Sequence, residues 1–203
     1  MGGSLKYEEI INATQGEEKY QNIKNFVETG TYKGDTTLMA SDHYDKVFTI
    51  EIVPELHYNS KLRAEKAEKT NINFYLGDSV KLLQQIVPLV QNGGVFFIDA
   101  HQSGFDTSNN GKQVPLMDEL KVLLSTRLGP SLFIFDDVRF WVNHDQAAWD
   151  WTDVSEQGII RAFTEQGYTV DKFFVHNDRF FVLARAIVHE PIFLKNVMKA
   201  YSN

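Results

Sequence analysis

The chain has 203 residues, 20 of them basic and 27 acidic, and its formal net charge is −7. Its length fits one domain, its acidic balance disfavours a surface for duplex nucleic acid, and no apolar run approaches the roughly 18 residues of a membrane span. The absence of cysteine excludes disulfides, thiolate catalysis and thiolate metal sites. The N-terminus has neither the basic nor the apolar region of a secretory signal, so a soluble, cytoplasmic protein is expected.

Short apolar or β-branched runs alternate with segments of helical period along most of the chain. The runs predict strands at Asn25–Thr29, Val47–Ile52, Asn73–Leu76, Val95–Asp99 and Leu132–Phe135. The helical segments between them are Pro54–Thr70, Val80–Val90 and Leu116–Leu128. Repeated alternation of this kind predicts the α/β class, with a doubly wound, mostly parallel sheet covered by helices on both faces.

The last third of the chain departs from this alternation. A helix is predicted at Ile159–Gln166, followed by strands at Val170–Val175 and Arg179–Ala184. The short turn between the two strands predicts an antiparallel hairpin. The expected organisation is a helical N-terminal extension at 1–24, one domain at 25–190 and a helical tail at 191–203.

Five consecutive predicted strands end in carboxylates. These are Glu28, Glu51, Asp78, Asp99 and the pair Asp136-Asp137. Ligands of an open parallel sheet bind at the carboxyl ends of its strands. A single acid there is commonly a helix N-cap, but clustered negative charge needs cations, hydroxyl and amine donors, or raised pKa values. The series predicts a ligand rich in hydroxyls together with a metal ion.

The turn after the first predicted strand reads VETGTYKGDTT over residues 27–37. Gly30 permits a tight backbone turn, and Gly34 permits the close approach of a helix. The turn lacks the middle glycine of the dinucleotide fingerprint and the Gly-Lys-Ser/Thr of the P-loop, which disfavours a nicotinamide dehydrogenase. An acid beside this turn repels phosphate and favours an ammonium group, and Glu51 lies where an acid binds ribose hydroxyls in this fold class.

Four motifs together, VETGTYKG, the acid of FTIEI, GDS and FIDAH, resemble the successive motifs of class I S-adenosylmethionine-dependent methyltransferases, over roughly residues 20–140. That family has a Rossmann-like sheet of seven strands, the last of them antiparallel, in agreement with the predicted hairpin. The resemblance implies that the first turn surrounds the methionine part of S-adenosylmethionine, that Glu51 binds the ribose and that Asp78 with Ser79 contacts the adenine. The full set of residues expected around the cofactor is Glu28, Gly30, Thr31, Tyr32, Gly34, Thr36, Thr37, Glu51, Asp78, Ser79 and Asp99.

A finer resemblance lies in Asp99-Ala100-His101 followed by Asp136-Asp137. It is similar to macrocin-type and aminocoumarin-type sugar O-methyltransferases, in which corresponding acids hold a divalent cation and the residue two after the first acid is a general base. The resemblance implies a site for Mg²⁺ or a similar cation at Asp99, Asp136 and Asp137, with His101 as the base. Three carboxylates suit such a cation, and imidazole accepts a proton near neutral pH. Two alternatives remain open: His101 as a structural residue, and Asp136-Asp137 as a helix cap.

The sequence therefore predicts a metal-assisted, S-adenosylmethionine-dependent O-methyltransferase for a small acceptor, such as a sugar or nucleotide sugar. A catechol-like diol is an alternative acceptor, and a non-catalytic ligand-binding domain of the same fold is an alternative function. Neither nucleic acid nor a membrane is expected as a partner, and a homo-oligomer is left open. Trp141, Trp149 and Trp151 form either a hydrophobic cluster under a loop or, the interpretation favoured here, a lid over the acceptor.

Overall fold

The computed structural model describes residues 4–100, 113–143, 147 and 149–187. The described elements, in chain order, are α1 (Tyr7–Thr14), the 3₁₀ turn η1 (Glu18–Tyr20), β1 (Asn25–Thr29), α2 (Asp35–Ser41), β2 (Lys46–Glu51), α3 (Pro54–Lys66), β3 (Ile72–Leu76), α4 (Ser79–Ile86), the 3₁₀ turn η2 (Val87–Leu89), β4 (Val95–Ile98), α5 (Leu116–Leu124), β5 (Ser131–Phe135), α6 (Val138–Val142), α7 (Glu156–Glu165), β6 (Tyr168–His176) and β7 (Arg179–Ala186). None of these helices has the length and apolar character needed to cross a membrane.

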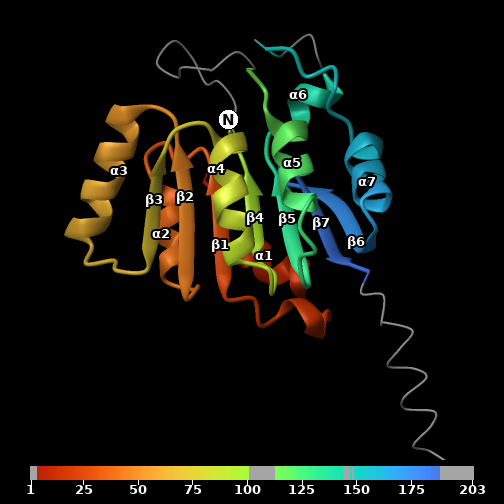
Figure 1. The fold of residues 1–203 in the computed structure, drawn as a ribbon, viewed down its shortest axis with the longest axis horizontal. Coiled ribbons are helices and arrows are strands. Elements are labelled where there is room, and N and C mark those ends of the chain that lie inside the picture. The colour runs from red at the N-terminus through yellow and green to blue at the C-terminus, as the bar shows by residue number, and fades with distance from the viewer. Residues whose placement is uncertain (1–3, 101–112, 144–146, 148, 188–203) are drawn as a thin grey trace, which may run out of the picture.

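One seven-stranded sheet runs through the molecule in the order β3-β2-β1-β4-β5-β7-β6 (Figure 1). The pairs among β1 to β5 are parallel, whereas β7 is antiparallel to both of its neighbours, β5 and β6. The predicted doubly wound sheet with a C-terminal hairpin is confirmed. The strand order reverses between β1 and β4, and the carboxyl ends at such a reversal are where ligands bind in open α/β sheets.

Two hydrophobic layers enclose the sheet. One consists of side chains from α4, α5 and α7 packed on inward-facing residues such as Phe96 and Phe133. The other joins α1 and α2 to the opposite face, where Phe97 and Ile134 point. Because successive strand residues face opposite sides, β4 and β5 supply both layers, which explains why their sequences are continuously apolar.

The structure corrects the ends of three predicted helices. Helix α3 ends at Lys66 rather than Thr70, because Glu68 has a left-handed φ of 55° that ends the helical path. Helix α4 ends at Ile86 and continues only as η2, which contains Pro88, a residue without the N–H that an α-helix needs. Helix α5 ends at Leu124 instead of Leu128. The predicted tail at 191–203 lies outside the described residues.

Helix α1, expected only as part of an extension, is fixed to the sheet by a buried ion pair. Arg179 at the start of β7 places Nη1 3.2 and 3.1 Å from the two carboxylate oxygens of Glu9. Its Nε lies 3.2 Å from Oδ1 of Asp136, without the alignment of a hydrogen bond, so this second contact is purely ionic. Glu9 also accepts from the side chain of Asn177 and from the backbone N–H of Lys6. One guanidinium thus neutralises acids from the first helix and from the end of β5.

Replacing Arg179 by Met should lower the free energy of unfolding by about 3–5 kcal/mol, because two buried carboxylates would lose their cation. Urea denaturation followed by tryptophan fluorescence measures the change. The matched control is Lys24→Met, which removes a cation from an exposed pair with Asp45 and should cost no more than about 1 kcal/mol. Equal unfolding midpoints for the two variants would contradict the stabilising role of Arg179.

Candidate functional site

The turn after β1 brings the carboxyl ends of β1, β2 and β4 together. The N–H groups of Gly30 and Thr31 both donate to the carbonyl of Ile50, at 2.9 and 3.1 Å. Gly30 has a φ of +83°, and a Cβ added there would come within 2.6 Å of the carbonyl oxygen of Asp99. Only glycine fits this position, because both the backbone conformation and the neighbouring strand exclude a side chain. The tight turn predicted from the sequence is thus present at the strand reversal.

Glu28, predicted to contact the methionine part of the cofactor, is buried within a network of threonine hydroxyls. Thr49 donates to its Oε2 at 2.8 Å, and Thr37 donates to the same oxygen. The hydroxyl of Thr31 lies 2.5 Å from that of Thr49. Burial raises the pKa of Glu28 to about 8, with hydrogen bonds from the two threonines offsetting part of the rise. The network joins β1, β2 and α2 beneath the turn, and the cofactor contact of Glu28 stays a prediction.

Glu51 ends β2 beside the same turn and organises the backbone around it. Its Oε2 accepts from the N–H of Tyr32 at 2.8 Å, and its Oε1 accepts from the N–H of Val53 at 2.9 Å. Each carboxylate oxygen has a second lone-pair direction, so Glu51 retains the capacity to accept from a ligand hydroxyl. Its position at the end of β2 is the one that the ribose prediction requires.

Asp78 caps helix α4, as the alternative interpretation of a strand-end acid anticipates. Its Oδ1 accepts from the N–H of Val80 at 3.0 Å and from that of Lys81 at 3.4 Å. Ser79, the first residue of the helix, is buried. The cap fixes the Gly77-Asp78-Ser79 segment next to the ends of β2 and β3, and the adenine contact stays a prediction.

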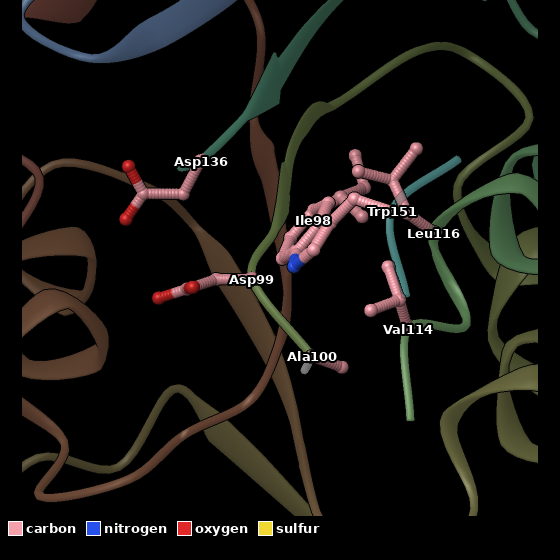
Figure 2. A pocket seen from close by; sticks show the side chains of 7 residues that line it. All are labelled: Ile98, Asp99, Ala100, Val114, Leu116, Asp136 and Trp151. Atoms are coloured by element: carbon pink, nitrogen blue, oxygen red, sulfur yellow. The ribbon is translucent and has the colours of Figure 1, made fainter. Parts of the chain in front are cut away.

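Asp99 and Asp136 follow the neighbouring strands β4 and β5, and they border a pocket that is otherwise apolar. Figure 2 shows their side chains on one side and those of Ile98, Leu116 and Trp151 on the other. Burial is the largest cause that raises the pKa of Asp136 to about 7, the charge of Asp99 adds to the rise, and that of Arg179 opposes it. In Figure 2 the carboxylate oxygens of both acids point away from the apolar side chains, so the acids border the pocket at its edge.

The predicted metal site is incomplete among the described residues, in which no three His, Asp or Glu side chains could jointly hold an ion. Asp137 lies 2.5 Å from a guanidinium nitrogen of Arg139, and Asp136 is paired with Arg179. Asp99 and Asp136 remain as a two-carboxylate portion of such a site. His101, the predicted base, lies outside the described residues.

The tryptophan segment belongs mainly to the core. Trp141 and Trp151 are buried with ring centroids 6.0 Å apart, and Trp149 is partly buried against the same hydrophobic layer. This arrangement favours the packing alternative over the expected lid, although Trp151 also lines the pocket beside Asp136.

Sequence reasoning missed three buried polar side chains near the strand ends: Thr49, Glu119 and Arg179. For Glu119 a signal exists, because it lies three residues after Leu116 and four before Leu123, on the apolar face of its helix. A charged residue on that face is unexpected unless it has a partner. Thr49 is similarly a polar residue inside an otherwise apolar strand.

Comparisons with known proteins identify the fold of this chain. No protein-family profile and no curated protein sequence matches the chain. The O-methyltransferase from Bacillus cereus in complex with S-adenosylhomocysteine (SAH) superposes with a TM-score of 0.61 at 18% identity, over 90% of this chain and 82% of that one. A putative caffeoyl-CoA O-methyltransferase from Staphylococcus aureus gives 0.59 at 16%, over 91% and 86%. TomG from Streptomyces achromogenes, an O-methyltransferase of tomaymycin synthesis solved with S-adenosylmethionine, gives 0.57 at 13%, over 91% and 82%.

The chain has the class I S-adenosylmethionine-dependent methyltransferase fold. At these identities the likeness extends to the fold alone.

The free energy of unfolding should fall as the pH rises from about 4.5 to 8. Glu28 titrates with a pKa of about 8 in the folded protein against 4.5 ordinarily, so the folded state holds a proton that the unfolded state has lost. Each such carboxyl lowers stability by up to about 1.4 kcal/mol per pH unit across this range. Urea unfolding at several pH values should show a shallower slope for Glu28→Gln, while the exposed control Glu55→Gln keeps the wild-type slope. An unchanged slope in Glu28→Gln would show that Glu28 is not protonated in the folded protein.

Proposed function

We propose that this protein is an S-adenosylmethionine-dependent methyltransferase that methylates a hydroxyl group of a small acceptor. The observation that carries the proposal is the acidic carboxyl edge around the Gly30 turn, on a fold shared with two O-methyltransferases solved with S-adenosylmethionine or SAH. The ligand has an ammonium group and ribose hydroxyls to donate, and Glu51 and Asp99 supply acceptors at the ends of β2 and β4, the two strands that flank β1. A nicotinamide cofactor fits less well, because its pyrophosphate would meet these acids.

The transfer needs alignment and one proton acceptor. S-adenosylmethionine supplies an electrophilic methyl group, whose carbon–sulfur bond breaks as the acceptor oxygen attacks in line. The bonding pair stays on sulfur, which becomes the neutral thioether of SAH, and the hydroxyl proton goes to a base. His101 is the proposed base, on the motif alone. The chain's part is to orient both substrates across the ends of β1 and β4 and to exclude water with the apolar pocket wall.

Isothermal titration calorimetry with SAH tests the cofactor half of this proposal. The wild-type protein should bind, and Glu51→Ala should weaken binding by about 1–3 kcal/mol because the ribose hydroxyls lose a charged acceptor. Glu55→Ala, on the exposed first turn of α3, is the matched control and should bind as the wild type does. No binding by the wild-type protein would overturn the methyltransferase proposal, and unchanged affinity in Glu51→Ala would remove Glu51 from the site.

The acceptor class is part of the same proposal. Two carboxylates beside an apolar wall suit a molecule that presents hydroxyl donors from a compact body, as both a sugar or nucleotide sugar and a catechol-like diol do. Transfer of labelled methyl groups to a panel of both classes separates them. SAH binding without turnover on any acceptor would favour the alternative of a non-catalytic ligand-binding domain.

Metal assistance is the second part of the proposal and rests on Asp99 and Asp136. If a cation joins these acids, excess chelator should abolish turnover on the accepted substrate and Mg²⁺ should restore it. Asp136→Asn should lose most turnover while SAH affinity changes by less than about threefold, because the cofactor contacts lie at other strand ends. Asp153→Asn, in the loop before α7, serves as the control. Full activity in excess chelator would exclude the metal and leave the remaining mechanism intact.

A further inference from the structure

Glu119 is a buried acid that neither the sequence motifs nor the proposed chemistry uses. It lies on α5, its side chain is 0% exposed, and its helix packs against α4 on one face of the sheet (Figure 1). Its neighbours along the same helical face, Leu116 and Leu123, belong to the hydrophobic layer. An apolar side chain would be buried at this position without the cost of removing a carboxyl group from water.

Glu119 contacts the candidate cofactor site at the end of β1. The hydroxyl of Thr29, the last residue of β1, donates to its Oε2 at 3.4 Å. The N–H of Asp99, which follows β4, donates in turn to Oγ1 of Thr29 at 3.3 Å. Ser79, the first residue of α4, is buried nearby, and its hydroxyl lowers the pKa of Glu119. The carboxyl group of Glu119 thus connects α5 with the ends of β1 and β4, beside the beginning of α4.

The hydrogen bonding of Glu119 is incomplete, so the burial of its carboxyl group is only partly compensated. Oε1 of Glu119 is buried without a hydrogen-bond partner. Burial raises the pKa of Glu119 to about 8, and the nearby hydroxyls of Ser79 and Thr29 offset only part of this rise. The placement therefore costs stability in the ligand-free protein. A residue that costs stability while joining strand ends at a binding edge is typical of a functional constraint.

We propose that Glu119 is a positioning residue of the cofactor site: through the hydroxyl of Thr29 it fixes the end of β1 against α5, which packs on α4, so that the methionine-binding and adenine-binding segments keep one spacing. This inference rests on the proposed function. It assigns Glu119 no contact with substrate or cofactor. Its effect passes through Thr29 and through the packing of α5 on α4.

Calorimetry with SAH on four variants tests this role. Glu119→Leu, of similar size but without an acceptor, should lower SAH affinity about tenfold or more. Glu119→Gln keeps an acceptor oxygen and should stay within about threefold of the wild type. Thr29→Val removes the hydroxyl that connects the two segments and should resemble Glu119→Leu. The double variant should be no weaker than either single variant, because both remove the same connection.

Asp118→Asn, the neighbouring residue on α5, is the matched control and should bind SAH as the wild type does. Wild-type affinity in Glu119→Leu, or additive losses in the double variant, would overturn the inference. Equal losses in Glu119→Gln and Glu119→Leu would also overturn it, because hydrogen-bond acceptance would then not be the cause.

The unfolding free energies of the same variants separate this inference from the proposed function. If the wild-type protein fails to bind SAH, the proposed function falls, and non-additive unfolding energies of Thr29→Val and Glu119→Leu would still support the connection between β1 and α5. Additive unfolding energies in that case would overturn the connection as well.

Discussion

Negative charge gathered at one edge of the sheet is the constraint on which the rest of the molecule depends. Acids follow five strands in succession, and parallel strands bring those acids to the same edge. Four of these strand ends have different partners: threonine hydroxyls for Glu28, backbone N–H groups for Glu51, the start of a helix for Asp78 and a guanidinium for Asp136. The fold thereby holds acceptors close together, which leaves the edge suited to a ligand that carries donors and positive charge.

The compensation is uneven between the two sides of the strand reversal. On the β1 and β2 side, backbone N–H groups hold Glu51 and fix its geometry without cancelling its charge. Burial raises the pKa of Glu28 to about 8, so that acid adds little charge at neutral pH. On the β4 and β5 side Arg179 and Arg139 lie against Asp136 and Asp137, so much of the charge is cancelled within the protein. The first side therefore retains the negative charge of Glu51, while the second side has a more nearly neutral, partly apolar pocket.

The fold and the strand-end acids could be predicted from the sequence because both depend on local periodicity. Each apolar run gives a strand, each strand of a parallel sheet ends at the same edge, and an acid at that point needs no distant partner to be noticed. Helix ends were predicted less well. The left-handed position that ends α3 is occupied by Glu68 and not by glycine, the residue from which such a position can be predicted. The buried polar contacts near the strand ends could not be predicted. Glu119 and Thr29 are 90 residues apart in the sequence, and Arg179 and Glu9 are 170 apart. These contacts depend on which helix packs on which strand, and local sequence patterns do not give that packing.

The ion pair between Glu9 and Arg179 also bears on the order in which the chain reaches its native contacts. Helix α1 is synthesised well before β7, yet the cation that makes the burial of Glu9 tolerable lies at the start of β7. Until β7 lies in place between β5 and β6, α1 would bring an uncompensated acid to the face of the sheet, which opposes its docking. We therefore expect α1 to reach its native contacts only together with β7 or after it, although α1 precedes β7 in the chain.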